Sequence, residues 1–75
     1  MNQKREAVDD ELEAAIQRAM KLRIKMREIQ DATGIDETVL WRWRNGTKPN
    51  WERRQHVLDT IDAMIKQAKD DYAQA

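Results

Sequence analysis

The chain of 75 residues contains no cysteine, one histidine, one proline and two glycines. Without cysteine there can be neither a disulfide framework nor a thiolate metal site. Zinc needs several nitrogen or sulfur ligands, so the single His56 argues against a zinc centre and we expect no metal. The sequence also offers no nucleophile with a neighbouring base and no glycine-rich phosphate loop. We therefore expect neither enzymatic activity nor a cofactor.

Long apolar runs are missing as well. No stretch approaches the roughly 18 apolar residues of a membrane span, and the N-terminus lacks the apolar segment of a signal peptide. The expected location is therefore the cytoplasm. A single domain of this length buries only about 60% of the surface of its unfolded chain. It is therefore marginally stable alone, and a partner chain would help.

Charge is balanced overall but unevenly distributed along the chain. There are 14 basic and 14 acidic residues, so the net charge is zero. Residues 17–54 contain ten basic and five acidic residues, whereas residues 1–16 and 55–75 are both net acidic. The local field matters more for phosphate binding than the total charge does. The middle of the chain is therefore the part expected to attract a nucleic acid.

The spacing of apolar residues predicts an all-α protein. Apolar positions recurring every three or four residues indicate a first helix over 9–22 and a long final helix over 50–72. Residues 1–7 are polar and are expected to be frayed. Residues 22–25 contain no glycine, proline or good capping residue, so the residues alone leave one uninterrupted helix over 9–33 as an alternative.

Most of the residues that interrupt regular structure lie between Thr33 and Pro49. Gly34 can end a helix because glycine adopts a left-handed conformation at little cost. Asp36 can cap a following helix, predicted over 37–44, and Asn45 with Gly46 should stop it. A helix, a tight turn at glycine and a second helix with polar residues form a helix-turn-helix pattern. We interpret 37–44 as the recognition helix of a small DNA-binding domain.

The final helix is longer than a four-helix core of this size requires. An apolar stripe left uncovered usually meets a partner. One hypothesis is a homodimer, and the alternative is that the stripe folds back onto the first helix. The predicted dimer interface consists of Ile61, Met64, Ile65, Ala68 and Tyr72.

From Leu12 to Ile65 the sequence resembles the lambda-repressor-like (Cro/XRE-type) helix-turn-helix family. Ile29 lies five residues before Gly34, and Gly46 lies twelve residues after it. Within that span the resemblance places two apolar side chains, Leu40 and Trp43, at the core positions of the recognition helix. The run 42–49 looks like the usual exit from that helix in the family.

The resemblance implies a compact four-helix domain with an extended C-terminal helix. It also favours a break near 23–25, which makes 26–33 the second helix. Two residues depart from the family pattern. Gln30 stands where the family often has alanine, and Met26 stands where it often has glutamine at the start of the second helix.

In this family the N-terminal part of the recognition helix lies in the major groove. The positions resembling base contacts are Glu37, Thr38, Trp41 and Arg42. Arg42 is the strongest candidate because a guanidinium can pair with O6 and N7 of guanine at once. The positions resembling phosphate contacts are Lys25, Arg27, Arg44, Asn45, Thr47 and Lys48.

Each of these positions also has an ordinary structural explanation. Arg42 and Arg44 can be solvated surface residues, and Glu37 can simply offset the helix dipole. The acidic cluster over 9–13 is interpreted as a solvated helix start. Trp41 should face outwards, where it meets DNA, a second subunit or another protein, unless it packs partly on the final helix.

The other two tryptophans are assigned to the interior of the domain. Trp43 is expected to be buried in the core, and Trp51 is expected to pack beneath the turn.

The leading hypothesis is a sequence-specific DNA-binding regulator of the phage-repressor type that binds a two-fold symmetric duplex site as a dimer. The first alternative is a helical protein-interaction module, an adaptor or inhibitor, that binds a second protein through Trp41 or the acidic termini. The second alternative is a recombination directionality or architectural DNA factor.

Overall fold

The structure, a computed structural model, describes residues 9–74, and every regular element in that range is a helix. The predicted all-α class with four helices is therefore confirmed. Residues 1–7, which were expected to be frayed, lie outside the described residues. The helices are α1 (Asp10–Lys21), α2 (Met26–Thr33), α3 (Glu37–Arg44) and α4 (Trp51–Gln74).

The chain breaks between α1 and α2, which excludes the uninterrupted helix over 9–33. Arg23 adopts a left-handed conformation with φ of 68°. Its N–H donates to the Met20 carbonyl at 2.9 Å, and the Ile24 N–H donates to the Ala19 carbonyl at 3.1 Å. This pair of hydrogen bonds is a Schellman motif, which is usually formed around glycine. The motif brings Ile24 against the core beside Ala19, since both side chains are buried, and this contact offsets the strain at Arg23.

The turn before α3 follows the predicted residues, and a further cap begins α4. Gly34 ends α2 in the left-handed region, with φ of 77°. Asp36 caps α3, its Oδ2 accepting from the Thr38 N–H at 2.8 Å. Asn50 caps α4, its Oδ1 accepting from the Glu52 N–H at 2.8 Å. These side chains satisfy backbone donors that a helix start otherwise leaves unpaired.

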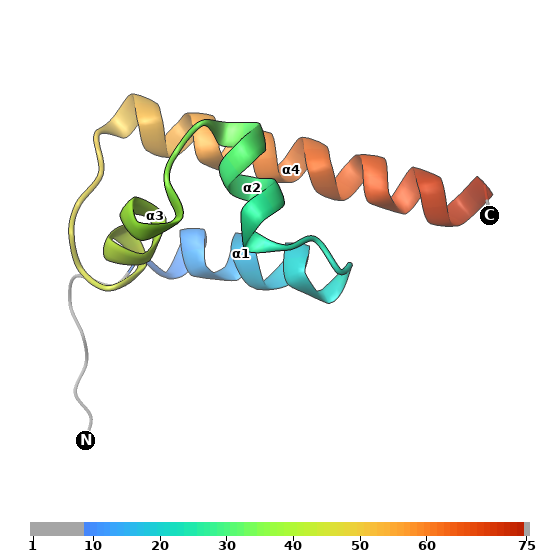
Figure 1. The fold of residues 1–75 in the computed structure, drawn as a ribbon, viewed down its shortest axis with the longest axis horizontal. Helices are drawn as coiled ribbons and strands as arrows, with labels where there is room; N and C mark the ends of the chain where they lie inside the picture. The colour runs from blue at the N-terminus through green and yellow to red at the C-terminus, as the bar shows by residue number, and fades with distance from the viewer. Residues whose placement is uncertain (1–8, 75) are drawn as a thin grey trace, which may run out of the picture.

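The core lies where α1 and α4 pack along each other, and α2 and α3 close it. Figure 1 shows α1 and α4 running in the same direction along the long axis of the molecule, with α3 near the start of α4. The largest completely buried side chains come from all four helices. They are Leu12, Ile16, Ile29, Leu40, Val57 and Ile61.

The three tryptophans occupy different environments. Trp43 is 5% exposed, as predicted, and Trp41 is 58% exposed on the outer face of α3. The prediction for Trp51 is wrong, because this side chain is 71% exposed. Trp51 is the first residue of α4, and the buried residues of that helix begin only at Val57, six positions later. It therefore lies outside the core.

The apolar stripe of α4 divides into a buried and an exposed part. Ile61 is completely buried and Ile65 is 8% exposed within the core of their own chain. For Ile61 and Ile65 the structure agrees with the alternative, in which the stripe packs back onto its own domain. These two side chains are therefore not free to form the predicted dimer interface. Met64 and Ala68 are half-buried, and Tyr72 is 58% exposed. Figure 1 shows the last turns of α4 extending past the other helices.

Within residues 9–74, none of the helices combines the length and apolar character needed to cross a bilayer.

Candidate functional site

The candidate site is the outer face of α3. Leu40 is completely buried and Trp43 nearly so, and these two side chains anchor the helix in the core. The four residues predicted to contact bases lie on the exposed part of α3, as the face assignment requires. They are Glu37, Thr38, Trp41 and Arg42.

A groove of about 430 Å³ runs beside this face, between α2 and α3. Trp41 and Met26 give it apolar surface, and Asp36 and Glu37 contribute carboxylates. The full set of lining residues is Met26, Gln30, Asp36, Glu37, Thr38, Trp41 and Arg44.

Gln30 holds the start of α3 against α2. Its side-chain Oε1 accepts a hydrogen bond from the backbone N–H of Glu37 at 2.8 Å. Together with the Asp36 cap on Thr38, this leaves two backbone donors of the first turn of α3 already satisfied. Gln30, one of the two residues that depart from the pattern of the family the sequence resembles, therefore has a defined structural role. Alanine at this position could not supply the acceptor.

Arg44 differs from the prediction. Its Nε donates to Glu13 Oε1 at 2.7 Å and its Nη2 donates to Oε2 at 3.3 Å, and the side chain is only 19% exposed. A guanidinium held by a carboxylate in this two-bond geometry is already neutralised and oriented. Arg44 therefore joins α3 to α1 in this structure, and a phosphate would have to compete with Glu13 for its guanidinium.

The other predicted phosphate ligands are solvent-exposed. They are Lys25, Arg27, Asn45, Thr47 and Lys48. Asn45 also has an internal role, because its Nδ2 donates to the Trp41 carbonyl at 2.8 Å and so satisfies an acceptor in the last turn of α3. Lys25 and Arg27, at the start of α2, and Lys48, after α3, are left as exposed cations.

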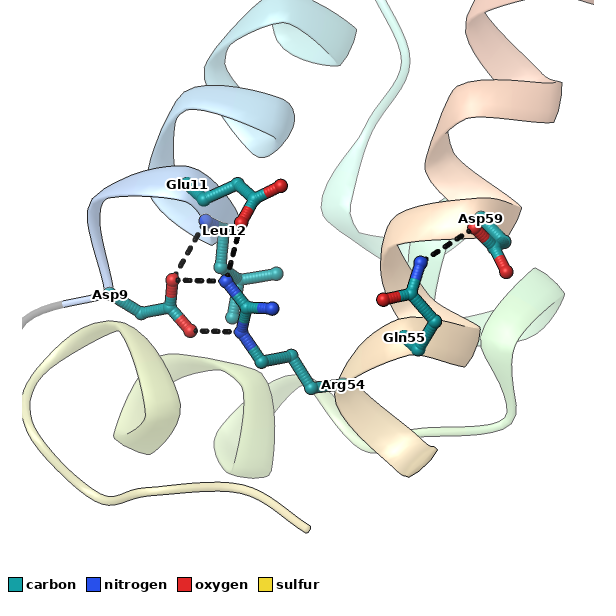
Figure 2. A network of polar contacts seen from close by, with 6 residues as sticks. All are labelled: Asp9, Glu11, Leu12, Arg54, Gln55 and Asp59. Carbon is teal, nitrogen blue, oxygen red and sulfur yellow. Dashed lines mark hydrogen bonds and ion pairs between the residues drawn. The ribbon is translucent and has the colours of Figure 1, made fainter. Parts of the chain in front are cut away.

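A second ion-pair cluster joins the start of α4 to the start of α1, and Figure 2 shows it. Arg54 Nε donates to Asp9 Oδ2 at 2.7 Å. Arg54 Nη2 donates to Asp9 Oδ1 at 3.1 Å and to Glu11 Oε1 at 2.8 Å. The hydrogen bond from Arg54 holds the pKa of the Asp9 carboxyl below its ordinary value, and the two carboxylates raise the pKa of Arg54. The acidic cluster is thus not merely a solvated helix start.

These pairs change the interpretation of the charge distribution. Acidic residues of α1 and its cap neutralise Arg44 and Arg54, two of the ten cations counted in residues 17–54. The basic middle and the acidic beginning of the sequence are therefore in contact in the fold. The other eight cations of residues 17–54 are exposed and form no ion pair with a described residue: they are Arg18, Lys21, Arg23, Lys25, Arg27, Arg42, Lys48 and Arg53.

Acid is expected to weaken the cluster at Arg54. The pKa of Asp9 is lower in the folded chain than in the unfolded chain, so unfolding takes up a proton at low pH. The stabilisation is present above the ordinary carboxyl pKa of about 4 and is lost as the pH falls through the lowered pKa of Asp9. Arg54→Gln should reduce the free energy of unfolding by about 1–2 kcal/mol at neutral pH and by much less near pH 2. Urea unfolding at both pH values measures the difference.

The matched control is Arg53→Gln, because Arg53 is the exposed neighbour on the same turn of α4. It should change stability by less than about 0.5 kcal/mol at either pH. Equal pH dependence of the two variants would show that the Arg54–Asp9 pair does not stabilise the fold.

Other site chemistry is limited in the described part of the chain. No group of three or more His, Cys, Asp or Glu side chains there is placed to hold a metal ion. His56 Nε2 lies 2.9 Å from the Thr33 carbonyl oxygen, where it links α4 to the end of α2.

The chain matches no family model, no curated protein and no solved structure. The likeness to lambda-repressor-like domains therefore stays an expectation that depends on its residues and their spacing.

Proposed function

We propose that this protein is a small regulator of the phage-repressor type that binds double-stranded DNA in a sequence-specific manner, with α3 in the major groove. The observation that carries the proposal is the division of α3 into two faces. Leu40 and Trp43 fix one face in the core, while Thr38, Trp41 and Arg42 are presented to solvent on the rest. A helix that is rigidly held and exposes hydrogen-bonding side chains is the element that major-groove recognition requires.

Exposed cations in the neighbouring segments support the proposal. Lys25 and Arg27 lie at the start of α2, and Lys48 lies in the turn after α3. Contacts from such side chains to phosphates position a recognition helix without reading sequence. Base readout is then assigned to Arg42, and the phosphate role predicted for Arg44 is dropped because Glu13 holds its guanidinium.

The direct test is a fluorescence-anisotropy titration of a labelled mixed-sequence duplex at low and at physiological salt. We expect micromolar binding that weakens steeply as salt rises, because phosphate neutralisation releases counterions. Binding of this kind justifies a randomised-site selection to find the preferred sequence. A complete absence of binding at low salt would reject the proposal.

Homodimerisation through the end of α4 belongs to the same proposal. Tyr72 is exposed and continues the stripe of Met64 and Ala68, which pack only partly against the core. A dimer would present two copies of α3 to a two-fold symmetric site. Removing α4 beyond Ile61 is a poor test, because it would also remove Ile65 from the core.

A point substitution tests the dimer without disturbing the core. Tyr72→Lys should weaken self-association about tenfold, because it removes an aromatic contact and adds like charges across a symmetric interface. Sedimentation velocity over a range of concentrations measures the effect. Trp51→Lys, at the opposite end of α4, is the control and should leave the dimer unchanged. A native chain that sediments as a monomer throughout contradicts the dimer.

A further inference from the structure

The groove between α2 and α3 combines an exposed aromatic side chain with two carboxylates. It measures about 430 Å³ and has both apolar and acidic lining. Trp41 lines it and is 58% exposed, so its ring is open to a ligand. Indole rings bind cations through their electron-rich faces more strongly than other aromatic side chains do. Met26 adds a flexible apolar surface of the kind that adapts to different partners.

The charge of this groove is negative. Asp36 and Glu37 line it and are exposed. Arg44 is the one cation among the lining residues, and Glu13 already neutralises it through two hydrogen bonds. A positively charged ligand group is therefore complementary to the groove, whereas a phosphate would meet two carboxylates.

Backbone geometry also disfavours an anion at this position. The start of a helix normally attracts anions through its unpaired N–H groups and its dipole. Here the Glu37 N–H donates to Gln30 and the Thr38 N–H donates to Asp36. The two carboxylates already supply negative charge at the start of α3. The groove therefore offers carboxylate acceptors to a ligand, whereas the backbone N–H groups of Glu37 and Thr38 are already hydrogen-bonded within the chain.

We propose that the α2–α3 groove binds an arginine or lysine side chain of a basic protein segment. The aliphatic stem of such a side chain suits the Met26 and Trp41 surfaces, and its charged head suits Asp36 and Glu37. This inference depends on the groove and not on DNA binding. If α3 also binds DNA, the two ligands exclude each other, because Glu37, Thr38 and Trp41 belong to both contact sets.

The test is a nuclear magnetic resonance titration of the ¹⁵N-labelled full chain. The probe is a blocked five-residue peptide of alternating glycine and arginine, and its neutral twin carries citrulline in place of arginine. The arginine peptide should produce saturable shifts of the Trp41 indole N–H and of the Glu37 and Thr38 amides, and the citrulline peptide should not. Equal shifts with both peptides, or shifts confined to the other acidic residues of the chain, overturn the proposal.

Matched variants locate the binding. Trp41→Ala and Glu37→Gln should each weaken the arginine peptide, by about 2- to 30-fold for the tryptophan. Trp51→Ala and Asp59→Asn are the controls. Trp51 is 71% exposed, Asp59 is an exposed carboxylate, and neither lines the groove. A loss of affinity in the controls as large as in the groove variants overturns the assignment.

Duplex binding, measured separately by anisotropy, keeps this inference distinct from the proposed function. Peptide binding without duplex binding supports the groove assignment and rejects the DNA proposal. A duplex that shifts the Trp41 and Glu37 signals while the arginine peptide does not assigns the groove to nucleic acid and overturns the inference.

Discussion

Replacing Trp43 with alanine is expected to lower the free energy of unfolding by about 3–5 kcal/mol. Trp43 is 5% exposed and packs with Leu40 in the core that α3 closes. Truncation to alanine removes the largest apolar contact area that any single residue gives α3 and leaves a cavity that a well-packed interior fills only partly. Small domains have only about 5–15 kcal/mol of stability in total, so this loss is a large share of it and should lower the midpoint of thermal unfolding by more than about 10 °C.

The other two tryptophans provide controls with the same change in side-chain volume. Trp41 is 58% exposed and Trp51 is 71% exposed, so Trp41→Ala and Trp51→Ala should each cost less than about 1 kcal/mol. Thermal and urea unfolding followed by circular dichroism compares the three variants directly. If Trp41→Ala or Trp51→Ala destabilises the chain as much as Trp43→Ala does, the orientation of α3 or α4 is wrong.

The local features of this fold could be predicted from the sequence because they depend on neighbouring residues. Apolar spacing indicated the first and last helices, and Gly34 and Asp36 marked the turn between α2 and α3. The break at Arg23 was harder to see. An arginine in the left-handed region has no residue-level signal, and the burial of Ile24 that offsets it depends on the tertiary core.

Long-range ion pairs were the part of the candidate site that the sequence could not show. Arg54 meets Asp9 across 45 residues and Arg44 meets Glu13 across 31 residues. Charge spacing predicts partners only within three or four positions on one helix. Segment charges counted along the chain therefore overstated the positive field, because they did not reveal which cations the fold neutralises.

The division of α4 shows the same limit for apolar residues. Periodicity places Ile61, Ile65 and Tyr72 on one stripe, but it does not tell how far α1 covers that stripe. Core packing takes the first two residues and leaves Tyr72 exposed. The length of the neighbouring helix decides where the buried part ends, and that length depended on the break at Arg23.

Alanine substitution of two neighbouring arginines on α3 is expected to affect two different properties, DNA affinity at Arg42 and the stability of the fold at Arg44. Arg42 is exposed, and no hydrogen bond or ion pair engages its guanidinium among the described residues. In a complex with its preferred duplex, Arg42→Ala should lower affinity by about 1–3 kcal/mol and relax base choice at one position. Arg44→Ala should leave base choice unchanged, because Glu13 already holds that side chain, and should instead cost up to about 1 kcal/mol of stability.

A third variant separates base recognition from phosphate contacts. Lys48 is exposed in the turn after α3, so Lys48→Ala should weaken binding to all duplexes by a similar factor and reduce the salt dependence by the share of about one phosphate contact. Anisotropy titrations of selected and scrambled duplexes at several salt concentrations distinguish the two kinds of loss. The role of α3 in DNA recognition is refuted if Arg42→Ala and Lys48→Ala both leave duplex affinity unchanged. Relaxed base choice with Arg44→Ala, and none with Arg42→Ala, would show instead that DNA displaces Glu13 and that the face of α3 nearer α1 reads the sequence.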